Sequence, residues 1–198
     1  TFTNNNTILN CDTNMNYVNI NECNINNTKS FAFISGHRLE NITLDQCVLE
    51  QNYTLIGSNR DICYLHPFTI TDCYVENGSP IIDDSIIYNG SSGKVGGTIN
   101  YRGGWYYNPN TLMFNIANTD TINYQLNINV SEVYFESITT PFINASNGVN
   151  GVIDLSRNIP LFGVVSDVNN TVNGRNLSII STHYADEYTP YGIRYSAP

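Results

Sequence analysis

A repeating pattern built around one small residue constrains the fold of this chain more than any other feature. Each copy alternates apolar and polar residues, reaches a small or apolar residue at a fixed place, and continues through one more apolar residue to a turn former. We call the fixed place the ladder position. The clearest copies begin at Val18, Ile42 and Phe68. The ladder positions recur at similar intervals along the chain and hold Cys23, Cys47, Cys73, Gly104, Val133 and Ser166.

This recurrence predicts a coil of stacked turns. A single turn cannot bury its apolar residues, but stacked turns pair strand to strand at about 4.8 Å and bury a continuous core. The pattern resembles the right-handed parallel β-helix, the pectin-lyase-like family that includes polysaccharide lyases, phage tailspikes and surface adhesins. The resemblance rests on inward residues at a bend, matched here by Cys23, Cys47 and Cys73, and it covers residues 18 to about 180.

The resemblance implies an all-β fold, a right-handed parallel β-helix (solenoid) of about six rungs. We expect residues 1–17 to form an N-terminal cap or a link to a preceding segment, 18–180 the β-helix, and 181–198 a C-terminal cap or linker. The alternative fold is two Ig-like β-sandwich domains that divide near the loop at 89–97, because short strands separated by frequent turns also suit that fold.

The charge balance excludes two classes of partner. The chain has 8 Lys and Arg residues against 17 Asp and Glu residues, a formal charge of −9 without a basic cluster, so we expect no nucleic acid and no anionic membrane as partner. No apolar run approaches the roughly 18 residues of a membrane span, so membrane insertion is not expected. The chain begins at Thr1 rather than Met, and we expect it to be a processed or partial product.

Asparagine is abundant in this chain and creates an excess of glycosylation motifs. Ten N-x-S/T triplets occur, about twice the number expected from the composition, although Pro80 disfavours the one at Asn77. The excess predicts an extracellular, cell-surface or virion-surface glycoprotein. Such triplets also arise in an Asn-rich turn repeat for structural reasons. The predicted glycosylation sites are Asn5, Asn26, Asn41, Asn52, Asn89, Asn129, Asn144, Asn169 and Asn176.

The cysteines and histidines favour structure over chemistry. Cys23, Cys47 and Cys73 are expected to stack inward as reduced thiols, with a disulfide between neighbours as the alternative. A disulfide between Cys11 and Cys63 is a further alternative. The histidines at 37, 66 and 183 have no ligand spacing, so we expect no metal and no cofactor.

The residues that follow the ladder positions predict an outer surface. Tyr74, Trp105 and Tyr134 each come directly after a ladder residue, so strand alternation turns them outward as an aromatic stripe. Two positions further stand acidic residues and a tyrosine: Glu50, Glu76, Tyr107 and Glu136. Aromatic rings cover the apolar faces of sugars and carboxylates accept hydrogen bonds from their hydroxyls. The alternative interpretation of the stripe is an ordinary cross-strand ladder that stabilises the sheet.

An enzymatic alternative uses the same surface. Glu76 and Glu136, two turns apart, would stand about 10 Å from each other, close to the roughly 6.5 to 9.5 Å of an inverting glycosidase pair. Arg102 is a nearby base for a lyase and a further candidate contact to the ligand. Activity is uncertain, and a glycoside hydrolase acting on a polysaccharide is the expected class if the chain is an enzyme.

The sequence therefore predicts a structural or adhesive β-helix domain outside the cell or on a virion. Its outer aromatic face is expected to bind glycans or a neighbouring protein subunit. Because the two ends of a solenoid need caps, we also expect contact with another domain, a homo-oligomer or a larger assembly.

Overall fold

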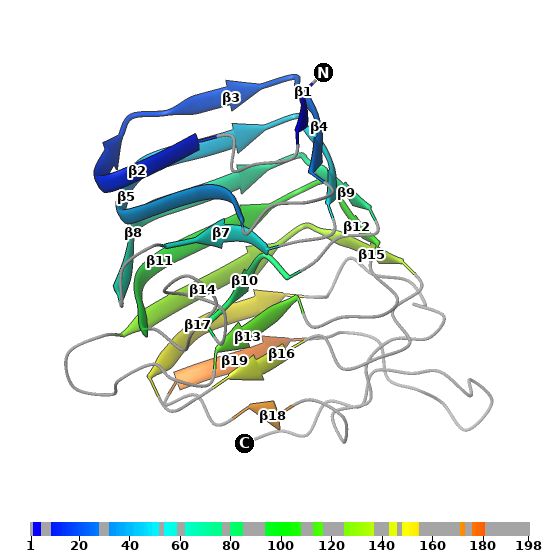
Figure 1. Cartoon of the computed structure of the whole chain (residues 1–198). Helices are drawn as coiled ribbons and strands as arrows, with labels where there is room; N and C mark the ends of the chain where they lie inside the picture. The colour runs from blue at the N-terminus through cyan, green and yellow to red at the C-terminus, as the bar shows by residue number, and fades with distance from the viewer. Residues whose placement is uncertain are drawn as a thin grey trace.

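The structure, a computed structural model, consists of β-strands stacked turn upon turn (Figure 1). It describes residues 2–4, 9–27, 32–51, 54–58, 62–76, 80–84, 94–107, 113–116, 125–136, 143–145, 148–154, 171–172 and 176–180. Every strand pairing in these ranges is parallel, and neighbouring strands in a sheet come from successive turns of the chain. A sandwich of Ig-like domains would be antiparallel, so that alternative is wrong and the predicted parallel β-solenoid is confirmed.

One sheet, here called the short sheet, has six strands that stack in chain order. These strands are three or four residues long, and those after the first start just after the ladder positions. In stacking order they are β1 (Phe2–Asn4), β4 (Asn24–Asn27), β6 (Val48–Gln51), β9 (Tyr74–Glu76), β12 (Trp105–Tyr107) and β15 (Tyr134–Glu136).

The second sheet has 13 strands and two arms. The long arm precedes the ladder positions and consists of β2 (Leu9–Asn16), β3 (Asn19–Asn21), β5 (Ala32–Asp45), β8 (Ile62–Thr71), β11 (Lys94–Arg102), β14 (Leu126–Ser131), β17 (Val149–Asp154) and β19 (Asn176–Ile180). The narrow arm consists of β7 (Thr54–Gly57), β10 (Ile82–Asp83), β13 (Phe114–Ile116), β16 (Ile143–Ala145) and β18 (Thr171–Val172).

The two arms join through β5. The beginning of β5 pairs with β7 of the narrow arm, and its later residues pair with β8 of the long arm. Because the short sheet, the long arm and the narrow arm contain different numbers of strands, the predicted count of about six rungs does not describe the coil as a whole.

Stacked apolar columns form the core. In the long arm, Ile42 is in register with Phe68, Phe68 with Ile99, and Ile99 with Ile128, and all four are fully buried. A second column contains Leu44, Ile70, Tyr101 and Val130. Because each side chain packs on the same position of the next turn, burial extends continuously along the stack.

The bend between the long arm and the short sheet has the same backbone conformation in five turns. The residue before each ladder position has a positive φ between 50° and 67°: these residues are Glu22, Gln46, Asp72, Gly103 and Glu132. The residue after the ladder position then donates its backbone N–H to the ladder carbonyl of the preceding turn, as Trp105 does to Cys73 at 2.8 Å. These bonds hold the bends in register and place the outer face of the short sheet.

All regular secondary structure among the described residues is β-strand. These residues therefore include no helix that is long and apolar enough to cross a membrane.

Candidate functional site

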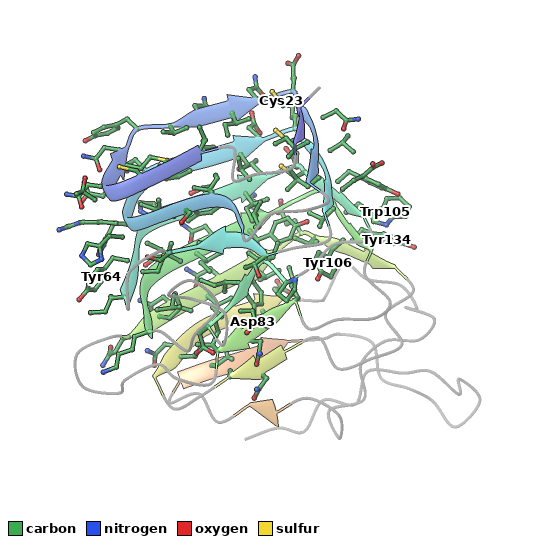
Figure 2. All side chains as sticks on the ribbon, in the orientation of Figure 1. Cys23, Tyr64, Asp83, Trp105, Tyr106 and Tyr134 are labelled. Atoms are coloured by element: carbon green, nitrogen blue, oxygen red, sulfur yellow. The ribbon has the colours of Figure 1, made fainter. Side chains whose placement is uncertain are left out.

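The predicted aromatic stripe lies on the outer face of the short sheet. Tyr74, Trp105 and Tyr134 are the first residues of β9, β12 and β15, and they are directly in register. The next residue of β9 and β12 points inward, so Val75 and Tyr106 are fully buried. Figure 2 shows Trp105 and Tyr134 at the outer edge of the coil and Tyr106 inside it.

The three rings contact one another. The Tyr74 and Trp105 centroids lie 5.8 Å apart with the ring planes tilted by 54°, and the Trp105 and Tyr134 centroids lie 4.6 Å apart with an interplanar angle of 64°. Tyr134 is 41 % exposed, whereas Tyr74 and Trp105 are half-buried. We call these three residues the aromatic ladder. It presents a continuous apolar strip with one ring on each turn, a spacing on the scale of a sugar ring.

Trp105 has a feature that packing alone does not require. Its indole Nε1 is shielded from solvent and, within the described part of the chain, has no hydrogen-bond partner. A buried donor without a partner costs about 1–3 kcal/mol. Below it, the Tyr101 hydroxyl donates to the Trp105 carbonyl at 3.3 Å and fixes the start of β12. A phenylalanine would place a ring in the ladder without the unpaired donor.

The acidic column beside the ladder is also in register. Glu50 lies opposite Glu76, Glu76 opposite Tyr107, and Tyr107 opposite Glu136. Asn26 continues this column on the N-terminal side, opposite Glu50. The side chains of Glu76, Tyr107 and Glu136 lie outside the described part of the structure, so their predicted roles in binding or catalysis stay predictions.

Arg102 belongs to the bend rather than to the acidic column. It is the last residue of β11, in the long arm, and its Nε donates to Glu132 Oε2 at 3.0 Å. This hydrogen bond and the charge of Glu132 raise the pKa of the Arg102 guanidinium. The structure therefore gives Arg102 an acidic partner at the next bend, and its role toward a ligand is untested.

The predicted glycosylation sites fall in different environments. Asn41 is exposed and has a φ of 51°. In contrast, Asn129 Nδ2 donates to Asn100 Oδ1 at 3.0 Å, and Asn144 Nδ2 donates to Asn115 Oδ1 at 2.9 Å, so the nitrogen that would carry a glycan is used inside strands. Asn26 and Asn176 lie in β4 and β19, and their side chains are not described. Asn5, Asn52, Asn89 and Asn169 lie outside the described residues.

The ladder cysteines face inward as predicted. Cys47 and Cys73 are buried, Cys23 is half-buried near the N-terminal end of the stack, and all five cysteines are free. Each ladder thiol donates to the carbonyl two residues before it, as Cys73 does to Thr71 at 3.3 Å. Burial raises the pKa of Cys63 and of Cys73 to about 12. The alternatives of a ladder disulfide and of a Cys11–Cys63 bridge are therefore not realised.

Sequence reasoning missed a cluster at the other end of the long arm. His37 and His66 look scattered in the sequence, yet both rings contact Tyr64. His183 lies outside the described residues. Within the ranges that the structure describes, no three His, Cys, Asp or Glu side chains are grouped so that they could hold a metal ion. The interval between Arg38 and Tyr64 equals that between Cys47 and Cys73, and this equality is the signal that would have placed them side by side.

Comparison with known proteins adds no relative. No protein-family model matches the sequence, and no curated protein or solved structure matches it either. The strand register therefore carries the parallel β-solenoid assignment by itself, and the finer resemblance to the pectin-lyase-like family stays without support from a match.

Proposed function

We propose that this chain is a structural and adhesive β-solenoid module, displayed outside the cell or on a virion, that binds glycans along the aromatic ladder. The supporting observation is the ladder itself: three outward rings in register on three successive turns, with the single Trp of the chain at the centre. Rings that contact each other are held in place before a ligand arrives, which reduces the entropy that binding must overcome.

Burial of the thiols is compatible with an oxidising location. Thiolates, rather than thiols, react with oxidants and disulfides. Because burial raises the pKa of Cys63 and Cys73 to about 12, these two cysteines stay protonated at neutral pH. A secreted or surface protein can therefore retain them in reduced form.

The second candidate function is hydrolysis of the bound glycan. It is favoured by the register of the acidic column, which puts Glu50 directly opposite Glu76 and places Glu136 two turns from Glu76. One strand spacing is about 4.8 Å, so these pairs span the range that retaining and inverting glycosidases use. Under this proposal Glu76 and Glu136 are the acid and the base.

A binding screen followed by product analysis tests both functions. The intact chain is applied to a glycan array, and each oligosaccharide that binds is incubated with the chain and chromatographed. Binding with an unchanged oligosaccharide supports the adhesive module, whereas shortened products support the hydrolase. The absence of binding to every glycan contradicts both, and would favour a subunit contact on the ladder. Light scattering at high concentration then tests that contact, because a monomer would contradict self-association.

A further inference from the structure

Residues from three successive turns meet at the end of the long arm that lies away from the aromatic ladder. Figure 2 shows Tyr64 on the opposite side of the coil from Trp105. Arg38 of β5 is in register with Tyr64 of β8, and Glu40 of β5 is in register with His66 of β8. Lys94 begins β11, the next turn. We call this group the corner cluster: His37, Arg38, Glu40, Tyr64, His66 and Lys94.

Strand alternation turns four residues of the corner cluster outward. Leu39 of β5 and Cys63 and Leu65 of β8 are fully buried, so Arg38, Glu40, Tyr64 and His66, which alternate with them, face outward. Arg38, His66 and Lys94 are exposed, and Tyr64 is half-buried. The cluster is thus an accessible surface on a rigid sheet, a better base for a site than a loop.

Two histidines hold the Tyr64 ring in place. The His66 ring stacks on it with centroids 5.8 Å apart and planes at 24°, and the His37 ring meets it edge-on at 5.8 Å. His37 is itself anchored, because its Nδ1 donates to the Ile62 carbonyl at 3.1 Å. On the following turn the residue in register with Tyr64 is Gly96, which has no side chain. Gly96 is buried, so the exposed part of the Tyr64 ring is the part that a ligand ring can contact.

The charge of the corner is opposite to that of the chain. The sequence has a net charge of −9, and the cationic residues within the described ranges are Arg38, Lys94 and Arg102. Two of these three therefore lie in the corner cluster. Arg38 forms an ion pair with Glu40 through Nε, and the Arg38 side chain is still 47 % exposed. That contact orients the guanidinium and leaves its two Nη groups for a second carboxylate, which arginine binds in a fork.

From this geometry we propose that the corner cluster is a binding site for a carbohydrate that carries a carboxylate. Arg38 binds the carboxylate through its Nη groups, the exposed part of the Tyr64 ring packs against the apolar face of the sugar, and Lys94 adds attraction. This site does not depend on the aromatic ladder, because it lies on a different sheet and on the other side of the coil.

His66 makes the site sensitive to pH. Partial desolvation of the His66 ring and the positive charge of Arg38 lower the pKa of His66, and the charge of Glu40 opposes this shift. The other titratable groups around it are His37 on β5, Tyr64 on β8 and Lys94 on β11. His66 is therefore mostly neutral at pH 7, and it gains a positive charge as the pH falls through its lowered pKa. A sugar carboxylate that is still ionised in that range is then attracted more strongly.

Calorimetric titration of the intact chain tests the site with three probes. 3′-Sialyllactose and tri-galacturonate carry carboxylates on different sugars, and lactose is the neutral control. We expect at least one acidic sugar to bind ten-fold or more tightly than lactose, and to lose affinity as salt is raised. Equal affinity for lactose, or no affinity for either acidic sugar, would overturn the proposal.

A carboxylate without a sugar ring separates charge from sugar recognition. N-acetylglutamate should bind at least ten-fold more weakly than the acidic sugar, because it cannot pack a ring face against Tyr64. Equal binding of N-acetylglutamate and the acidic sugar would also overturn the proposal.

Arginine variants assign the binding to the corner. Arg38→Gln should lower the affinity about ten-fold, and Arg38→Lys, which keeps the charge but not the fork, should lower it about three-fold. The matched control Arg102→Gln removes a cation from the other end of β11 and should stay within two-fold of the unmodified chain. Circular dichroism verifies that each variant is folded. If Arg38→Gln does not fold, the affinity of the Arg38→Lys variant is used to test the assignment. Unchanged affinity in the folded Arg38 variants would contradict the assignment.

The pH profile and the ladder variant complete the test. Affinity for the acidic sugar should increase as the pH falls from 8 through the lowered pKa of His66, and His66→Asn should reduce that increase. Trp105→Ala should leave acidic-sugar binding at the corner within two-fold. If Trp105→Ala removes it instead, the acidic sugar binds the aromatic ladder and the corner site is refuted.

Discussion

Two columns pass through the same bend of successive turns and hold adjacent residues of the sequence, yet one faces the core and the other faces the surface. The inner column contains the ladder residues Cys47, Cys73 and Val133, which are buried. The outer column contains Tyr74, Trp105 and Tyr134, which form a strip at the surface. Burial limits the size of the residues in the inner column, whereas the residues of the outer column lie at the surface, where we propose that they bind glycans.

The largest loss of stability is expected from a substitution in the inner column where space is smallest. Gly104 has a φ of 76°, and a Cβ atom there would stand 2.1 Å from the Cys73 carbonyl oxygen. Gly104→Ala therefore combines left-handed strain with a backbone clash, and we expect a loss of about 2–5 kcal/mol in the free energy of unfolding. Urea denaturation measures the loss.

Gly103→Ala is the matched control, one residue away. Its added Cβ would meet Asp72 Oδ1, the end of a flexible side chain, and Glu132, Asp72 and Gln46 already adopt a similar φ in other turns. We expect a loss of about 1 kcal/mol. If the two alanine variants lost equal stability, the close packing of successive bends at the inner column would be contradicted.

The next largest loss of stability is expected when the buried thiols of Cys63 and Cys73 ionise. Cys73 belongs to the inner column. Cys63 and Cys73 have pKa values raised to about 12, above the reference value of 9.0, so the folded state holds their protons more tightly than the unfolded state. Their stabilising contribution is complete below pH 9 and is lost as the pH rises from there toward 12. At pH 10 we expect a loss on the order of 1 kcal/mol per thiol, measured by urea denaturation at pH 8 and pH 10.

The variant Cys73→Val sharpens this test, because valine already occupies the ladder position at Val133. It should keep the fold at pH 8 and show a smaller loss of stability at pH 10 than the unmodified chain. An unchanged pH dependence would mean that the Cys73 thiol does not contribute to it.

The outer column should matter less for stability than for binding. Trp105→Ala removes two ring contacts at a half-buried position, and we expect a loss of about 1 kcal/mol in unfolding free energy. Glycan affinity should fall ten-fold or more. Trp105→Phe also removes the unpaired Nε1 donor, so its stability should stay within about 1 kcal/mol of the unmodified chain. A Trp105→Ala variant that unfolds would return the ladder to a purely structural role.

The smallest effect is expected on the exposed polar face of the long arm. Asn129→Ala removes the amide contact to Asn100, and because that contact is exposed we expect a loss of about 0.5 kcal/mol. Thermal unfolding followed by circular dichroism measures it. Asn115→Ala is the part-buried comparison, since Asn115 bonds to both Asp83 and Asn144, and it should cost more than Asn129→Ala.

The sequence predicts the inner and outer columns well, because both follow from local alternation and a repeated spacing. Cys47 and Cys73 face inward and Trp105 faces outward for that reason. The left-handed bend was not predicted, since Glu22, Gln46 and Glu132 are not residue types that favour a positive φ. Stacking hydrogen bonds impose that conformation on them, and it therefore leaves no local signal.

The corner cluster was missed for a different reason. Arg38 and Tyr64 are distant in the sequence, and only the register between β5 and β8 makes them neighbours. The interval from Arg38 to Tyr64 equals that from Cys47 to Cys73, but the repeat was recognised only from Ile42 and Phe68 onward, so the residues before these positions were not aligned. The predicted number of turns was wrong for a related reason: β5 is one strand of 14 residues that pairs in both arms of the second sheet. Features that depend on pairing between turns thus need the structure.

Fluorescence of Trp105 tests the central claim most directly, because it is the only tryptophan of the chain and sits at the centre of the aromatic ladder. The uncharged glycan that binds most tightly in the array screen is titrated into the intact chain while the indole emission is recorded. We expect a saturable change in emission whose midpoint equals the dissociation constant from calorimetry. Binding by calorimetry without any change in Trp105 emission would place the glycan elsewhere and contradict the aromatic ladder as its site.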